Sequence, residues 1–361
     1  PDATGAICGK IVKNGEKSVQ FDTNFFLSTS CSSGVENKTV SGCTKLSVIA
    51  LKACADMLGS PYLQNDDSTL NHGYPVFEWQ SEPYNFLGDG TASNPYQISS
   101  KAELEHMRNL INSDYFNKTY GHAYYIQTAN IDLENNTWTP IGIGYDKDGT
   151  FYSTKVFYGH YNGNKKYIRN FNGNGDVVEA GLFGIIDGTE SAEVQNLVVY
   201  GMITSTTVSH AGGIVGKICN NATIDGCGFV GDINISTSNA SAGGIVGIAT
   251  NGGTIANCYH NGKVVANESA GGVLGQSEFV EQGILTIENC YQANGEILAL
   301  GFAGSIAGNC TVGENIKGIL NISNCYCTND TETSTSSKNA TTDNTLTLSK
   351  SLLKKAADDL G

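Results

Sequence analysis

Hydrophobic and small residues recur at intervals of about 30 residues along the second half of the chain. One phrase, a small residue followed by glycines and two apolar residues, occurs at 180–184, 211–216, 242–247, 270–275 and 303–308. A second phrase, Ile or Val followed two residues later by Asn (Gly226 in one repeat) and then an apolar residue, follows each copy. A fixed period of this length predicts a repeat architecture in which each repeat packs on its neighbours.

The second phrase predicts a bend between two short strands. Ile255 and Cys258 are both apolar, but residues three apart in a straight strand point to opposite faces. Both can be buried only if the chain turns at Asn257, and Asn tolerates the left-handed backbone that such a turn needs. Gly-led runs such as 262–265 supply a third side. The predicted fold is therefore all-β, a right-handed parallel β-helix (β-solenoid) with short capping helices and coils stacked about 4.8 Å apart.

Four cysteines end the second phrase, and their context predicts a structural role. These are Cys227, Cys258, Cys290 and Cys325. The same slot holds Leu197 in one repeat and, in the alignment of the phrases, Phe171 in another. Neither Leu nor Phe can ligate a metal, so the slot requires a buried apolar side chain, as free Cys often is. We expect a buried cysteine ladder beside a ladder of corner asparagines, Asn257, Asn289 and Asn324.

A longer period links the two ends of the chain. Residues 50–59 and 352–361 agree at six of ten positions, with an offset of 302. Both segments have a Ser N-cap, apolar residues at helical spacing and a final Gly, which is typical of a short helix. The offset predicts solenoid modules of about 300 residues that follow one another in tandem.

This period divides the chain into two parts. Residues 1–88 are expected to end a preceding module, with a last coil, a capping helix at 47–59 and a closing strand at 74–79. Residues 89–361 are expected to form a second module. Its predicted parts are an N-terminal cap at 89–150, coils at 151–330, and a loop with a capping helix at 331–361; its closing strand is missing.

One cysteine pair lies outside the ladder. Cys31 and Cys43 flank a Ser- and Gly-rich loop, and the equivalent loop at 328–345 contains neither. Their joint absence there favours a disulfide between Cys31 and Cys43 over two free thiols.

Composition indicates which cellular compartment and which classes of partner are expected. The 361 residues include 21 Lys and Arg against 35 Asp and Glu, a net charge of −14. That charge argues against nucleic acid or an anionic membrane surface as a partner. No apolar run reaches the roughly 20 residues of a membrane span. Low charge and abundant Thr, Ser, Asn and Gly favour an extracellular or cell-surface protein.

The sequence contains few of the residues that catalysis would require. A β-helix that cleaves acidic polysaccharides needs clustered carboxylates and a basic side chain on one face, yet the only arginines are Arg108 and Arg169. The six histidines lack ligand spacing, so we expect no metal site, no cofactor and no enzymatic activity. Four tyrosines could stack on sugars or on one another, and the repeat favours the second: Tyr158, Tyr161, Tyr259 and Tyr291.

Several phrases resemble a known family. The stretch "AGGIVG…TIANCYHNGKV" resembles the GLUG-type repeat of large bacterial surface proteins. "NPYQISSKAELEHMRNLINS" is similar to the segment that opens such a module, and "NHGYPVFEW" resembles one that closes it. The resemblance implies a right-handed parallel β-helix in an adhesion-related surface protein without catalytic residues. The repeat also occurs in some immunoglobulin-A-cleaving metallopeptidases, whose His-Glu-x-x-His motif is absent from this sequence.

These observations predict a non-enzymatic extracellular surface protein whose tandem modules act as an adhesin or stalk. A structural subunit of an extracellular fibre, assembled end to end, is the first alternative, and a polysaccharide-active β-helix enzyme is the second. The expected partners are neighbouring modules of the same protein and host or matrix glycans or proteins.

Overall fold

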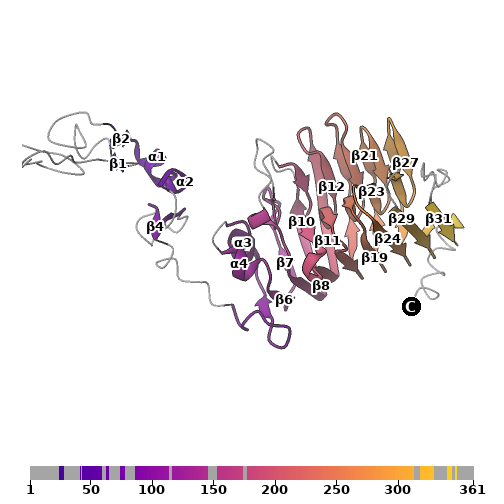
Figure 1. Cartoon of the computed structure of the whole chain (residues 1–361), viewed down its shortest axis with the longest axis horizontal. Coiled ribbons are helices and arrows are strands. Elements are labelled where there is room, and N and C mark those ends of the chain that lie inside the picture. Colours follow the sequence, from indigo (N-terminus) through magenta and orange to yellow (C-terminus); the bar gives the residue numbers. More distant parts are fainter. Residues whose placement is uncertain are drawn as a thin grey trace, which may run out of the picture. The chain divides into compact units, whose positions relative to one another are not determined.

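The structure is a computed structural model and divides into two compact units, residues 1–85 and 86–361 (Figure 1). It describes residues 24–27, 41, 43–58, 62–64, 74–77, 86–113, 116–144, 153–173, 177–312, 318–328, 340–343 and 346–347. The described residues contain no helix long and apolar enough to cross a membrane.

The second unit is a parallel β-solenoid of about 7 turns, which confirms the predicted fold. One complete coil consists of β14 (Thr223–Asp225), β15 (Gly228–Val230), β16 (Ile233–Ile235), β17 (Ser241–Gly243) and β18 (Val246–Thr250). Each strand pairs in parallel with its equivalent in the next coil, so that strands far apart in sequence lie side by side in Figure 1.

The other coils supply equivalent strands. Before β14 come β8 (His160–Asn172), β9 (Glu179–Ala180), β10 (Phe183–Asp187), β11 (Glu193–Ser205), β12 (His210–Gly212) and β13 (Val215–Cys219). After β18 come β19 (Gly253–Ala256), β20 (Tyr259–Asn261), β21 (Val264–Ala266), β22 (Ser269–Gly271), β23 (Leu274–Phe279), β24 (Gly283–Glu288), β25 (Tyr291–Ala293), β26 (Ile297–Ala299), β27 (Phe302–Gly304), β28 (Ala307–Val312), β29 (Gly318–Ser323) and β30 (Tyr326–Cys327).

The coil has more sides than the three that the sequence predicts. The glycine-rich phrase forms two further strands, such as β17 and β18, joined by a sharp turn at 244–245. Glycine permits this because the backbones approach closely: a Cβ on Gly243 would lie 2.0 Å from the carbonyl oxygen of Val246. The phrase therefore makes two sides of the coil.

The corner asparagines adopt the predicted left-handed backbone. The φ angles are 54° at Asn257, 54° at Asn289 and 50° at Asn324, and Gly226 has 60° at the equivalent corner. Their amides also join the coils. Asn289 Nδ2 donates to Asn257 Oδ1 at 3.1 Å, and Asn324 Nδ2 donates to Asn289 Oδ1 at 3.3 Å.

Replacing a corner asparagine should separate the contribution of the left-handed backbone from that of the amide hydrogen bonds. Asn289→Ala should lower the free energy of unfolding by about 2 kcal/mol, because Ala disfavours a left-handed backbone and loses both amide hydrogen bonds. Asn289→Gly should cost less than about 1 kcal/mol, because Gly keeps the backbone angle. Urea unfolding of both variants measures the difference; equal losses would contradict the backbone contribution.

One predicted register is wrong. The phrase alignment placed Phe171 in the slot of Leu197 and the ladder cysteines, but Phe171 pairs with Gly201 and Leu197 pairs with Lys166. Asn164 and Lys165 both have left-handed φ angles, so the first corner of β8 contains extra residues and shifts the register. Phe171 is fully buried on a different side of the coil.

A cap covers the N-terminal end of the solenoid. It contains β5 (Tyr96–Ile98), α3 (Lys101–Ile111), α4 (Asn117–Tyr120), β6 (Tyr124–Gln127), β7 (Ile131–Asp132) and, further on, the 3₁₀ helix η3 (Ser153–Lys155). A second 3₁₀ helix, η4 (Gly188–Glu190), lies within the coils, between β10 and β11. Ser100 Oγ accepts from Glu103 N at 3.3 Å, and Glu103 Oε2 accepts from Ser99 N at 2.7 Å. Ser100 thus caps the start of α3, while Glu103 reaches back to Ser99, one residue before the N-cap, in a variant of the capping box; the apolar face of α3 is buried. The compact unit begins at Phe86, which packs 5.3 Å from the Tyr96 ring, rather than at 89.

The C-terminal end also differs from the expected loop. Within 331–361, β31 (Ala340–Asp343) pairs in parallel with β29, and β32 (Leu346–Thr347) pairs with β30. These strands add part of another coil. The predicted capping helix after Ser349 lies outside the described residues.

The first unit contains a shorter set of elements. They are β1 (Asn24–Leu27), β2 (Cys43–Leu46), α1 (Val48–Lys52), α2 (Ala55–Leu58), β3 (Tyr62–Leu63) and β4 (Val76–Phe77). β1 and β2 pair in parallel, and β3 and β4 pair antiparallel. The helix predicted at 47–59 is broken at Ala53 and Cys54, where the Cys54 carbonyl starts a second turn by accepting from Met57 N and Leu58 N.

Candidate functional site

The cysteine ladder lies inside the solenoid. Cys227, Cys258, Cys290 and Cys325 are each at most 1% exposed. Each thiol lies near the carbonyl oxygen two residues earlier, for example Cys258 Sγ at 3.0 Å from Ala256 O. Cys227 N donates to Cys258 Sγ at 3.4 Å, which links adjacent coils. Burial raises the pKa of Cys258 well above its usual value, so the thiol stays neutral and unreactive.

The core also contains a histidine that the sequence did not distinguish. His260 is fully buried, pairs with Phe229 in the preceding coil and stacks on its ring at 5.9 Å. His260 Nε2 lies 3.0 Å from Gly231 O, consistent with a neutral ring that donates one hydrogen bond. Burial lowers the pKa of His260 to about 4. Gln292 occupies the same position in the next coil.

The low pKa of the buried His260 predicts that the folded protein loses stability in acid. The unfolded chain binds a proton at His260 below a pH of about 6.5, whereas the folded chain does so only near 4. Stability should therefore fall by about 3 kcal/mol as the pH drops from 6.5 to 4. Carboxylates contribute to acid unfolding as well, so the measurement compares urea unfolding of the parent chain and of His260→Gln across this range. The variant should lose less stability on acidification; identical pH profiles would contradict the assignment.

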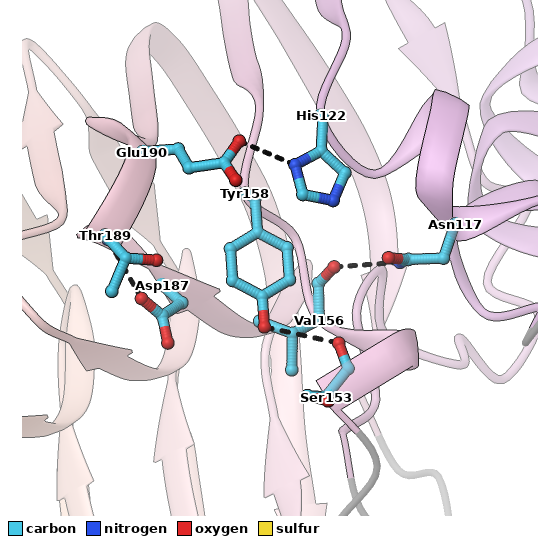
Figure 2. Close-up of polar contacts among 8 residues, drawn as sticks. All are labelled: Asn117, His122, Ser153, Val156, Tyr158, Asp187, Thr189 and Glu190. Carbon is cyan, nitrogen blue, oxygen red and sulfur yellow. Dashed lines mark hydrogen bonds and ion pairs between the residues drawn. The ribbon is translucent and has the colours of Figure 1, made fainter.

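A polar cluster joins the N-terminal cap to the first coils (Figure 2). His122 Nδ1 lies 2.7 Å from Glu190 Oε2, and the His122 ring stacks on Tyr158 at 4.8 Å. The Tyr158 hydroxyl donates to Ser153 O at 3.3 Å. Burial raises the pKa of Tyr158, and the Asp187 carboxylate adds to the effect. Tyr158 is therefore a neutral donor already committed to the backbone.

The remaining groups of this cluster serve backbone structure. Asp187 Oδ1 accepts from Thr189 N at 2.9 Å and caps the helix η4, while its second oxygen accepts from Asn220 Nδ2 at 3.0 Å. Asn117 Nδ2 donates to Val156 O at 2.9 Å (Figure 2). Such an arrangement can fix the cap on the first coils. Cys219 Sγ also lies 3.9 Å from Asp187 Oδ2, but burial and the Asp187 carboxylate raise the pKa of this thiol, so it stays protonated and is not an activated nucleophile.

Two further histidines form pairs of the same kind across coils. His160 Nδ1 lies 3.8 Å from Glu193 Oε2, and its ring stacks on Tyr124 at 4.2 Å. His210 Nδ1 lies 2.8 Å from Glu179 Oε2, and that carboxylate is 2% exposed. Sequence spacing could not reveal these pairs because the partners lie 31 to 68 residues apart. Among the described residues, no group of three His, Cys, Asp or Glu is placed to hold a metal ion.

The structure separates the four tyrosines considered for stacking. Tyr161 is buried in the core, and Tyr158 packs on His122. Tyr259 and Tyr291 stack on one another with ring centroids 5.2 Å apart and planes 9° apart. Both are half-buried on the outer surface.

The proposed disulfide stays a prediction. Cys43 begins β2, is half-buried and has a free thiol in the structure. Cys31 lies outside the described residues.

Comparisons with known proteins support the fold more than any activity. No family model matches the chain. A protein of Evansella cellulosilytica named "Putative Gly-rich membrane protein" is 34% identical over 139 residues, which are 37% of this chain and 14% of that protein. The chain thus spans about one seventh of the length of that relative.

A solved structure shares the architecture. The crystal structure of a "putative immunoglobulin A1 protease" from Bacteroides ovatus matches with a TM-score of 0.53. The match covers 76% of this chain and 90% of that one, at 21% identity. At this identity the likeness shows the β-solenoid fold alone.

Proposed function

We propose that this chain is a non-enzymatic part of an extracellular surface protein of the GLUG-repeat type, in which tandem solenoid modules act as an adhesin or stalk. The observation that carries the proposal is a structural arrangement that recurs along the chain. β1 pairs in parallel with β2 in the first unit, and β30 pairs in parallel with β32 about 300 residues later. Sequence similarity between 50–59 and 352–361 has the same offset.

The structural roles of the side chains described above support a scaffold function. The cysteine ladder is buried in the interior, and the corner amides bind from coil to coil. The polar cluster around His122 and Glu190 holds the cap in place. Each of these groups stabilises a long stack of coils, as a repeat protein requires. The name of the Evansella relative, a Gly-rich membrane protein, agrees with a place at the cell surface.

The test is the length of the native polypeptide. Material isolated from the producing cell surface should, after denaturation and reduction, contain this sequence within one chain several modules long. Peptide mapping should recover copies of the 300-residue unit from that single band. Protomers of 361 residues that assemble without covalent linkage would instead support the fibre subunit.

A second measurement addresses catalysis. The chain is incubated with polygalacturonate and alginate, and new reducing or unsaturated ends are assayed. We expect none. Product formation that persists after repurification would overturn the non-enzymatic proposal in favour of a polysaccharide-active enzyme.

A further inference from the structure

Five tyrosines gather on one outer side of the solenoid, which we call the tyrosine face. They are Tyr167 on β8, Tyr200 on β11, Tyr259 on β20, Tyr291 on β25 and Tyr326 on β30. Pairing places four of them in one column, which runs from Tyr167 through Val198 and Gly228 to Tyr259, Tyr291 and Tyr326. Tyr200 stands two residues beyond Val198 on the same strand and so lies on the same side.

The rings are held in fixed positions. Tyr259 leans over Gly228, where a Cβ would lie 2.3 Å from its Cζ atom, so the absence of a side chain at 228 makes room for the ring. Tyr291 stacks on Tyr259 at 5.2 Å. Tyr200 is 41% exposed and meets Tyr167 edge to face at 5.8 Å. Preorganised aromatic rings lose little conformational entropy when a ligand binds.

The tyrosine face carries one charged pair, at its first coil: Arg169 stands two residues beyond Tyr167 on β8, and its Nε lies 2.9 Å from Asp132 Oδ2. The other residues of its two columns are uncharged, although the chain has a net charge of −14. The column beside the tyrosines continues from Tyr200 through Val230 and Asn261 to Ala293. The charged residues Asp232, Lys263 and Glu296 lie in the corner beyond this face, each one residue before β16, β21 or β26, and Lys263 Nζ lies 3.2 Å from Glu296 Oε2. An acidic ligand would be repelled by the molecule as a whole, so a neutral ligand is favoured.

The face is long and narrow. β15, β20 and β25 have three residues each, so that two side chains per coil point outward. Five steps between coils make a strip roughly 24 Å long. A standard protein interface needs about 800 Å² on each partner, which is wider than this strip, whereas a linear polymer would fit along it.

From this geometry we propose that the tyrosine face binds a neutral glycan chain laid along the solenoid axis. The faces of aromatic rings carry partial negative charge and attract the C–H groups of a pyranose ring. Tyr200, which is 41% exposed, is the ring best placed for this contact, because Tyr259 and Tyr291 turn a face to one another. The coil spacing of about 4.8 Å is comparable to the length of one pyranose unit, so Tyr259, Tyr291 and Tyr326, which lie in three successive coils, are spaced about one sugar apart. Tyrosine hydroxyls and the Asn261 amide, which accepts from Asn294 Nδ2 at 2.8 Å, offer hydrogen bonds to sugar hydroxyls. This inference rests on the proposed surface function and names its ligand class.

The experiment is affinity electrophoresis of the whole chain in native gels. The gels contain galactomannan, xyloglucan or yeast mannan as neutral polymers, and polygalacturonate as an acidic one. We expect retardation by at least one neutral polymer and none by polygalacturonate. Tyr200→Ala should weaken the interaction roughly tenfold, and adding Tyr291→Ala should weaken it further, because aromatic anchors dominate such binding sites. Tyr200→Phe should bind nearly as well as the parent, because it keeps the ring.

Tyr124→Ala is the matched control, since Tyr124 also stacks in a surface pair but lies on a different strand and binds His160. Circular dichroism verifies that each variant is folded, and exposed Tyr200→Ala alone decides the question if the double variant does not fold. Absence of retardation by every neutral polymer, unchanged retardation of Tyr200→Ala, or retardation by polygalacturonate alone would overturn the inference. Binding only to a collagen-coated surface would assign a protein partner and overturn it too. None of these results bears on the length of the native chain, which tests the proposed function separately.

Discussion

Cys258→Asp should be among the most damaging single substitutions in this chain. The side chain at 258 is 1% exposed and lies between Cys227 and Cys290 in the ladder. A carboxylate there would lose its hydration without gaining a cationic partner, and the alternative is to take up a proton at a strongly raised pKa. We expect the free energy of unfolding at pH 7 to fall by about 4 kcal/mol. Urea unfolding followed by circular dichroism measures it.

Cys258→Val is the matched control for this substitution. Leu197 precedes the ladder at its equivalent position, which indicates that the slot accepts a branched apolar side chain. The cost should stay below about 1.5 kcal/mol, because volume and polarity change little. Zinc bound in a one-to-one ratio by the parent chain and lost in Cys258→Val would refute the packing role, as would equal destabilisation by Val and Asp.

Gly243→Ala should have an effect of similar size for a different reason. The added methyl group would lie 2.0 Å from Val246 O, 2.5 Å from Gly275 N and 2.8 Å from Val273 O. All three contacts are with backbone atoms of packed strands, so no side chain can move aside. The two strands β17 and β18 would have to separate, and we expect a loss of about 4 kcal/mol or more. Thermal unfolding and hydrogen exchange in the neighbouring coils measure the loss.

A second glycine tests whether the effect is specific to close packing. Gly226 has a φ of 60°, and its Cβ would lie 3.2 Å from the Asn196 side chain. Other coils have Asn at this corner, so Gly226→Asn should leave stability within about 1 kcal/mol of the parent. Similar damage by both substitutions would mean that glycine content in general, rather than the contact between β17 and β18, limits stability.

The regular part of the fold could be predicted because its causes are local and repeated. Ile255, Asn257 and Cys258 are explained only by a bent pair of strands, and the structure places a left-handed residue at the corner. The α3 helix was also predictable, because Ser100 caps its first turn and Glu103 reaches back to Ser99 N within four residues. These features depend on neighbours in the sequence and recur several times.

Prediction from local sequence patterns failed at the irregular coils. Phe171 follows an Ile-Arg-Asn sequence that matches the corner phrase, yet extra left-handed residues at Asn164 and Lys165 move it to another side. A match between two sequence phrases does not reveal residues inserted in a corner, whereas the register of the paired strands does. The strands β31 and β32 were missed because their Thr-rich sequence has no corner phrase.

The sequence by itself determined the β-solenoid, its period and the apolar character of the ladder, since these follow from side-chain alternation and backbone preference within each repeat. Only the tertiary structure decided which side chains meet across coils. His122 and Glu190, His210 and Glu179, and the column of Tyr259 and Tyr291 come together because parallel pairing brings residues about 30 or more apart into contact. The exact partner depends on the length of every corner and turn between them, and no local pattern contains that length.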